Sequence, residues 1–275
     1  MTIHKGHNNI LWISAAEASG DMHGAKLINY ISSITPDLEF RGMGGPEMRK
    51  TDFQAEFNSE QLSILGFTEV FAFLPFIFRL LKNVKQRLKS LRPKAVILID
   101  SPDLHFRIAR IAKKLNIPVY YYISPQVWAW RKGRVRFLRN YVDEMLCILP
   151  FEESFFKEHG VRAHFVGHPL QDELKDYKTQ EIEDKTIVML PGSRQKEVKN
   201  LLPCFARAAT ILAAYDPQIR FRLIKASQIA ESSIHESWPD HVPLDIYTST
   251  KRYTMISSSQ FAICASGTIT LEVSL

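Results

Sequence analysis

The chain has 275 residues, of which 45% are hydrophobic, 11% aromatic and 23% charged. This composition is typical of a globular protein with a sizeable core and excludes an intrinsically disordered chain. Lys and Arg number 35 against 29 Asp and Glu, which gives a formal net charge of +6. The three cysteines, Cys147, Cys204 and Cys264, are too far apart for a CxxC zinc site and too few for a disulfide framework.

Two stretches of the chain are basic and contain no acidic residue. The first runs from Arg79 to Lys94 and the second from Arg131 to Arg139. Such patches suit nucleic acid, anionic lipid or a phosphorylated substrate. Because no zinc-finger, RNA-recognition or basic-zipper pattern accompanies them, we do not expect nucleic-acid binding.

Short apolar runs alternate with amphipathic stretches through the first half of the chain. Strands are predicted at 10–13, 95–99, 118–123, 145–149 and 163–166, and helices at 20–31, 104–115 and 152–159. This alternation predicts a parallel sheet covered by helices on both faces.

The pattern restarts after the polar stretch 171–185. Strands are predicted at 186–190, 219–224 and 261–264, with a helix at 198–214. We therefore expect an α/β protein with two Rossmann-like, doubly wound domains, residues 1–168 and 169–275. The second is short of strands for such a domain, so we expect the chain to be incomplete at its C-terminal end.

Residues 62–81 are rich in phenylalanine, are interrupted by Glu69 and Pro75, and lead into the first basic stretch. A membrane-spanning helix needs about 20 mostly apolar residues, whereas an apolar segment followed by a basic one is typical of a membrane interface. An internal helix with a solvated basic end would have the same composition. We expect a membrane-interface segment at about residues 62–92.

Polar loops follow the predicted strands at the edge where open α/β sheets bind ligands. After the first strand, Glu17 and Asp21 could bind sugar hydroxyls, although Ser19 or Asp21 could instead cap the helix. Asp100 ends the strand 95–99, where burial would raise its pKa and make it a general base. Asp103 fits better as a helix cap.

Trp128 and Trp130 stand beside Arg131 and Lys132, just after the strand 118–123. Two indoles next to two cations suit a ligand with a sugar or apolar face and a phosphate. In an extended chain the two indoles would share one face, which core packing explains poorly.

Two loops of the second half, Pro-Gly-Ser-Arg at 191–194 and Ala-Ser-Gly-Thr at 265–268, each lie between a strand and a helix. Backbone N–H groups at a helix start, together with an arginine, favour a diphosphate site, and a glutamate one turn further could accept ribose hydroxyls. The expected nucleotide-binding residues are Gly192, Ser193, Arg194, Ser266, Gly267, Thr268 and Glu272. No residue spacing in the sequence suits a metal site, and we expect no cofactor.

Seven stretches of the chain resemble the lipid-A-disaccharide synthase family, whose members have the GT-B fold. They are residues 16–21, 42–48, 99–103, 124–131, 165–169, 190–194 and 265–268, in the family's order. The stretch Ser-Pro-Gln-Val-Trp-Ala-Trp at 124–130 is specific to this family, whereas the loops at 190–194 and 265–268 occur more widely in GT-B enzymes.

The resemblance implies an inverting hexosyltransferase with an acceptor-binding N-terminal domain and a UDP-sugar-binding C-terminal domain that face a cleft. It would join UDP-2,3-diacylglucosamine to 2,3-diacylglucosamine 1-phosphate (lipid X), giving the β-1,6-linked lipid A disaccharide 1-phosphate and UDP. Asp100 would be the catalytic base, assisted by Glu17. The residues expected to bind substrate are Ser19, Asp21, Trp128, Trp130 and Arg131.

Because both substrates are lipids, the resemblance also implies docking on anionic lipids at the cytoplasmic face of the inner membrane of Gram-negative bacteria. A homodimer is compatible with the sequence. Two alternatives remain: another GT-B enzyme that uses a UDP-sugar, such as the peptidoglycan precursor transferase or a UDP-sugar 2-epimerase, and a non-catalytic remnant that binds membrane lipids.

Overall fold

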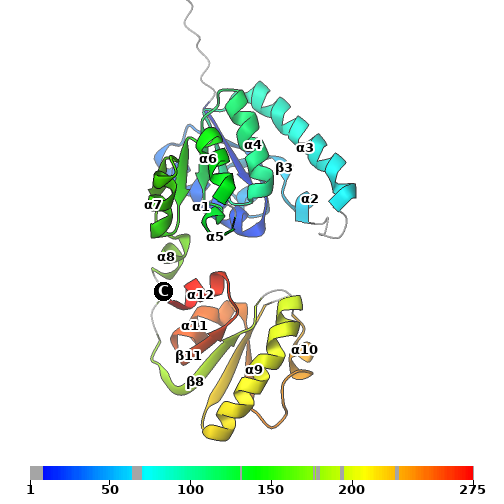
Figure 1. Cartoon of the computed structure of the whole chain (residues 1–275), viewed down its shortest axis with the longest axis vertical. Coiled ribbons are helices and arrows are strands. Elements are labelled where there is room, and N and C mark those ends of the chain that lie inside the picture. Colours follow the sequence, from blue (N-terminus) through cyan, green and yellow to red (C-terminus); the bar gives the residue numbers. More distant parts are fainter. Residues whose placement is uncertain are drawn as a thin grey trace, which may run out of the picture. The chain divides into compact units, whose positions relative to one another are not determined.

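The computed structural model describes residues 9–63, 70–130, 132–175, 177, 180–192, 195–226 and 229–274. The chain forms two compact units, Met1–Pro169 and Leu170–Leu275. Figure 1 draws the first unit in blue to green and the second in yellow-green to red. Each unit has its own sheet and its own core.

The sheet of the first unit contains seven strands in the order β3-β2-β1-β4-β5-β6-β7, and every pair is parallel. The strands are β1 (Ile10–Ala15), β2 (Glu39–Gly44), β3 (Phe53–Asn58), β4 (Ala95–Ile99), β5 (Val119–Tyr122), β6 (Glu144–Cys147) and β7 (Ala163–Phe165). The strand order reverses between β1 and β4. The loops after these two strands therefore lie at a topological switch point, where doubly wound sheets bind their ligands.

The helices of the first unit are α1 (Ala18–Ile34), α2 (Glu60–Ser63), α3 (Val70–Leu91), α4 (Pro102–Lys114), α5 (Val127–Trp130), α6 (Val135–Tyr141) and α7 (Pro150–Glu158), with short 3-10 turns at Met48–Lys50 and Lys132–Arg134. Strand β4 shows how they cover the sheet. Val96 and Leu98 pack on one face with α3, α4 and α6, and Ile97 and Ile99 pack on the other face with α1. Figure 1 shows these helices around the sheet. Because both faces of β4 are covered, its sequence is apolar throughout.

The second unit repeats this plan with four parallel strands in the order β10-β9-β8-β11. The strands are β8 (Glu183–Leu190), β9 (Arg220–Lys225), β10 (Leu244–Thr248) and β11 (Ser259–Cys264). The other elements are α8 (Pro169–Leu174), α9 (Gln195–Tyr215), α10 (Glu231–His235), a 3-10 turn at Ser249–Lys251, α11 (Arg252–Ser257) and α12 (Thr268–Ser274). Ile187 and Met189 pack against α9, and Val188 and Leu190 pack on the other face with α11 and α12.

Helix α3 carries the C-terminal part of the aromatic and basic segment. Leu80, Val84 and Leu88 recur at four-residue intervals and are buried in the core of the first unit. The exposed stripe, which we define as Phe78, Lys82, Lys85 and Lys89, faces away from that core at spacings of four, three and four residues. Residues 64–69, which belong to the same expected segment, lie outside the described residues. Within the described part of the chain, no helix has the length and apolar character needed to span a bilayer.

Candidate active site

Asp100 follows β4 directly, and it and Ser101 both have left-handed backbones, with φ of 50° and 48°. A residue other than glycine pays about 1–3 kcal/mol for this conformation. The backbone N–H of Asp100 donates to the carbonyl of Tyr122 in β5 at 3.1 Å. The chain therefore leaves the sheet in a sharp turn that is anchored to the neighbouring strand.

The backbone carbonyl of Asp100 accepts hydrogen bonds from two buried side chains. The hydroxyl of Tyr121 donates to it at 2.6 Å, and Nδ1 of His105 lies 2.7 Å from it. A carbonyl oxygen can only accept, so His105 carries a proton on Nδ1. Burial lowers the pKa of His105 to about 4, so the ring is neutral near pH 7 and its Nε2 accepts from Oγ of Ser14 at 3.0 Å. Burial also raises the pKa of Tyr121 well above its ordinary value, and its hydroxyl therefore keeps its proton.

The two carboxylates expected to be catalytic lie close together at the ends of adjacent strands. Ala15 of β1 pairs with Ile99 of β4, and Glu17 and Asp100 follow these residues. The hydroxyl of Ser101 donates to Oε1 of Glu17 at 3.1 Å. Burial, and then the charge of Glu17, raises the pKa of Asp100. A raised pKa makes this half-buried carboxylate a better proton acceptor than an ordinary aspartate.

Asp21 has a supporting position instead of the sugar-binding one we expected. Its side chain is buried and accepts hydrogen bonds from the backbone N–H groups of Gly45 at 2.6 Å, Glu47 at 2.8 Å and Met48 at 3.1 Å. A Cβ on Gly45 would lie 2.5 Å from Oδ2 of Asp21, so only glycine permits this approach. Asp21 thus holds the loop after β2.

The alternative that Ser19 or Asp21 caps α1 is wrong. Glu17 occupies the N-cap position of that helix, and no side-chain hydrogen bond caps it. Ser19 lies exposed in the first turn. Asp103 likewise does not cap α4, because Ser101 occupies the cap position, and Asp103 accepts a hydrogen bond from Arg134 at 2.8 Å.

Trp128 lies in the short helix α5 (Val127–Trp130), so the expectation of an extended chain at this position is wrong. Its Nε1 donates to Oε1 of Glu152 at 3.0 Å, and its ring meets Phe151 edge-on with centroids 4.9 Å apart. The side chain of Trp130 and the whole of Arg131 lie outside the described residues. Trp128 can therefore offer a ligand its ring but not its N–H group.

Three buried residues of this region were not predicted from the sequence: His105, Tyr121 and Glu152. Each is a polar residue on a buried face, with an exposed fraction of 1% or less. A polar residue among the apolar residues of a predicted buried face is the one sequence signal that could have identified them, since buried polar groups need hydrogen-bond partners.

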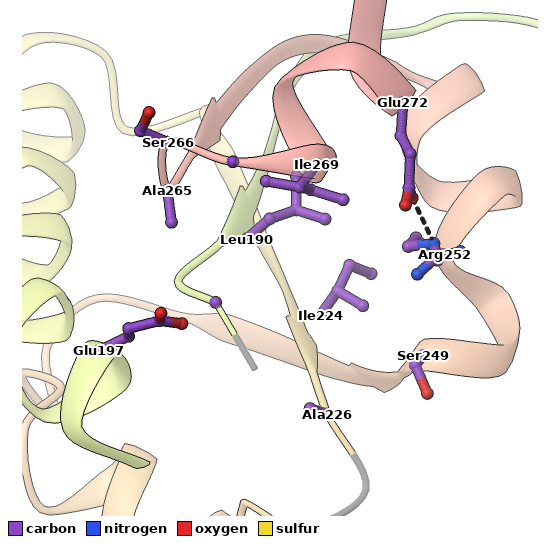
Figure 2. A pocket seen from close by; sticks show the side chains of 12 residues that line it. Leu190, Glu197, Ile224, Ala226, Ser249, Arg252, Ala265, Ser266, Ile269 and Glu272 are labelled. Atoms are coloured by element: carbon purple, nitrogen blue, oxygen red, sulfur yellow. Dashed lines mark ion pairs between the residues drawn. The ribbon is translucent and has the colours of Figure 1, made fainter. Parts of the chain in front are cut away.

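The second unit contains a pocket of about 340 Å³ at the carboxyl ends of β8, β9 and β11. Of the expected nucleotide-binding residues, Gly192, Ser266, Gly267 and Glu272 line it (Figure 2). Gly192 has φ of 109°, a conformation that favours glycine. Residues 193 and 194, the expected Ser193 and Arg194, lie outside the described residues, as does the side chain of Thr268.

An ion pair lies in this pocket between Arg252 and Glu272, with Nε and Oε2 2.8 Å apart. Figure 2 shows this pair on one side of the pocket and Glu197 on the other. Arg252 begins α11, a helix that the sequence analysis did not predict, and its role was therefore missed. The pocket thus combines a guanidinium group with two carboxylates. Across the described ranges, no three histidine, cysteine or acidic side chains gather into a candidate metal site.

The model of the family described as lipid-A-disaccharide synthetase matches residues 11–275. The chain belongs to this family. A lipid-A-disaccharide synthase of Nitrosococcus oceani is 37% identical over 273 residues, which cover 96% of this chain and 70% of the relative. Its counterpart in Syntrophus aciditrophicus is 39% identical over 282 residues, covering 98% and 73%. The expected family is therefore confirmed, as is the expectation of a glycosyltransferase, and the two alternative functions are not favoured.

Solved structures confirm the expected fold class. The structure described as "S. aureus MnaA-UDP co-structure" has a TM-score of 0.63 at 12% identity, covering 94% of this chain and 74% of that one. A UDP-GlcNAc 2-epimerase from Methanocaldococcus jannaschii has a TM-score of 0.60 at 10% identity, covering 96% and 80%. At these identities the likeness concerns the fold alone: two parallel-sheet, Rossmann-like units of the GT-B type.

Proposed function

We propose that the chain transfers a diacylglucosaminyl group from UDP-2,3-diacylglucosamine to the 6-hydroxyl of 2,3-diacylglucosamine 1-phosphate. The products are the β-1,6-linked disaccharide 1-phosphate of lipid A biosynthesis and UDP. The observation that carries this proposal is the family match over residues 11–275. It is supported by a carboxylate of raised pKa, Asp100, at the switch point of the first sheet.

In the proposed reaction, Asp100 accepts the proton of the acceptor 6-hydroxyl as its oxygen attacks the anomeric carbon of the donor. The new C–O bond forms on the face opposite UDP, the bond to the diphosphate breaks, and its electron pair leaves with UDP. Glu17 binds sugar hydroxyls and, through its charge, helps to raise the pKa of Asp100. Asp100 is thereby a competent base near neutral pH.

The acceptor would be held by residues of the first unit. We assign this role to Ser19, to the ring of Trp128, and to Trp130 and Arg131. An indole ring offers a flat apolar face to a sugar, and a guanidinium binds phosphate through paired hydrogen bonds. The fixed ring of Trp128, held by Glu152, supports the first of these assignments.

The UDP group would occupy the pocket of the second unit. Ser193 and Arg194, with backbone N–H groups of the loops at Gly192 and Ser266–Thr268, would bind the diphosphate and stabilise its charge as it leaves. Glu272, oriented by Arg252, would accept the ribose hydroxyls. The left-handed backbone of Gly192 and the 340 Å³ pocket around it support this placement.

We further propose that the exposed stripe of α3 binds anionic lipids at the cytoplasmic face of the inner membrane. Three lysines and Phe78, a residue that is 65% exposed, lie on one side of the helix. Aromatic and basic side chains on one exposed face are typical of helices that lie in a membrane interface. The acylated substrates proposed here would be reached from such a surface.

A transfer assay with both lipid sugars tests the reaction, with the disaccharide product detected by mass spectrometry. We expect product from the unaltered chain and none above background from Asp100→Asn. Asp103→Asn is the matched control, because Asp103 is exposed and bonded to Arg134, and we expect it to retain transfer. Absence of product from the unaltered chain would contradict the proposed function, and full activity of Asp100→Asn would contradict the proposed base.

A further inference from the structure

Side chains from three elements of the first unit form a hydrogen-bonded cluster around the carbonyl of Asp100. Tyr121 belongs to β5, His105 to α4, and Ser14, which fixes the outer nitrogen of His105, to β1. We propose that Tyr121 and His105 are positioning residues that hold the backbone of Asp100 in its left-handed conformation and so orient its carboxylate. This inference rests on the proposed function, in which Asp100 is the base.

The backbone at this turn is strained. Asp100 and Ser101 both have positive φ, although neither is glycine. Such a conformation persists only where the surroundings hold it. The hydrogen bonds from Tyr121 and His105 turn the carbonyl of Asp100 toward the buried interior, while the residue itself stays half-buried. Loss of either donor removes one of the two hydrogen bonds that stabilise the strained conformation.

The two donors are polar side chains in a fully buried environment. Tyr121 and His105 have exposed fractions of 0%. Packing alone would be served equally well by phenylalanine at 121 and by an apolar residue at 105. A buried hydroxyl or imidazole is costly unless it has a hydrogen-bond partner, and here both partner the same atom. Their polar groups therefore act on the turn and not only on the core.

The two donors are themselves held in place by their neighbours. Leu98 of β4 pairs with Tyr121 across the sheet, so the position of the tyrosine is set by the strand register. The Nε2 atom of His105 is hydrogen-bonded to Ser14, and the rings of His105 and Tyr121 form a T-shaped pair with centroids 6.4 Å apart. A carboxylate oriented through such supports keeps its geometry during catalysis, and small misplacements of a reacting group are costly in rate.

The test compares Tyr121→Phe with Tyr120→Phe in the transfer assay and in crystal structures. Tyr120 directly precedes Tyr121 on β5 and is exposed, so its variant is the matched control. For Tyr121→Phe we expect kcat to fall by about ten- to a hundredfold with KM changed less than about twofold, because only orientation is lost. We also expect the φ of Asp100 to leave the left-handed region. Tyr120→Phe should retain both the rate and the turn.

A second pair of variants separates positioning from packing. His105→Asn keeps an N–H donor near the carbonyl and should retain more of kcat than His105→Leu, which keeps only volume. Equal losses in both variants would overturn the role of His105. A kcat for Tyr121→Phe within about twofold of the unaltered chain, or an unchanged Asp100 backbone in its crystal structure, would overturn the role of Tyr121.

Asp100→Asn, assayed in parallel, distinguishes failure of the positioning role from failure of the base assignment. If it loses turnover while Tyr121→Phe does not, only the positioning role fails. If it keeps turnover, the base assignment fails. The crystal structure of Tyr121→Phe reports on the turn even in a preparation that shows no transfer, so the positioning role is tested in either case.

Discussion

The indole N–H of Trp128 donates to the carboxylate of Glu152 at 3.0 Å, and the other oxygen of that carboxylate accepts from the backbone N–H of Leu149 at 3.1 Å. Glu152 is 1% exposed, so water could not replace its carboxylate as the acceptor for the indole N–H of Trp128 or the backbone N–H of Leu149. The orientation of the tryptophan is thus fixed by the first turn of α7, a different helix from its own.

We expect Glu152→Gln to destabilise the fold by about 1–3 kcal/mol, because the amide group would turn a donor toward one of two existing donors. Urea denaturation measures the change, and tryptophan fluorescence reports the freed indole. Glu153→Gln is the control, since Glu153 forms an exposed pair with Lys157 and should change stability by less than about 0.5 kcal/mol. Equal stability of the two variants would contradict the role given to Glu152.

The pH dependence of transfer should report the environment of Asp100. Burial and the charge of Glu17 raise its pKa above the ordinary value of 3.8, and a base must be deprotonated to act. We therefore expect kcat/KM to fall as the pH is lowered through this raised pKa. Glu17→Gln removes the like charge and should move the acidic limb to lower pH, whereas Glu47→Gln, at an exposed pair with Lys50, should not. An acidic limb that stays in place in Glu17→Gln would contradict this coupling.

His105 should make the fold less stable in acid. Burial lowers its pKa from 6.5 to about 4, so the unfolded chain binds a proton in a pH range where the folded chain does not. The stabilisation is complete above pH 6.5 and is lost as the pH falls toward 4, with a magnitude of about 3 kcal/mol. Denaturation curves between these pH values should show this loss, and His105→Asn should flatten it. His241→Asn, at an exposed site, should leave the slope as it is.

Asp21→Asn tests whether this carboxylate holds a loop or binds a sugar. One carboxylate accepts from three backbone N–H groups, and an amide oxygen cannot replace both of its oxygens. We expect a loss of about 1–3 kcal/mol in urea denaturation. Asp37→Asn, in an exposed turn, serves as the control. A raised KM at unchanged stability would instead restore the sugar-binding role.

Charge reversal of the exposed stripe tests membrane attachment. Replacing Lys82, Lys85 and Lys89 with glutamate removes about 1 kcal/mol of attraction per lysine and adds repulsion, so binding to anionic vesicles should fall by about a hundredfold or more. Flotation with phosphatidylglycerol vesicles measures this. The same three-charge reversal at Lys26, Lys196 and Lys199, which are exposed elsewhere, controls for net charge. Unchanged flotation of the α3 variant would contradict the proposal.

The sequence was sufficient to predict the strands that are buried on both faces. β1, β4 and the C-terminal half of β8, residues 187–190, are nearly uninterrupted apolar runs, and such runs have few alternative interpretations. Strands β3 and β10 lie at sheet edges and alternate with polar residues, while β2 contains two glycines, which weaken any strand pattern. These three strands were not predicted.

The site, like the sheet, contains residues that could be predicted from the sequence and residues that could not. Glu17 and Asp100 were identified because they follow predicted strands, and chain order alone reveals such positions. The contacts of Tyr121 and His105 were not predictable, because they join side chains to a backbone carbonyl whose direction depends on φ. Local sequence does not determine that direction. It is determined by the packing of β1, β5 and α4, which carry Ser14, Tyr121 and His105.

The pairing of Ala15 with Ile99 places Glu17 and Asp100 just beyond the ends of two adjacent strands. Adjacent strands are separated by about 4.8 Å, a distance fixed by backbone hydrogen bonding and insensitive to side-chain identity. The positions of Glu17 and Asp100 therefore depend on the spacing of the paired strands, whereas the loops beyond them can lengthen or change composition. The loops can therefore change while the two strands that carry these carboxylates keep their spacing, and with it the influence of the Glu17 charge on the pKa of Asp100.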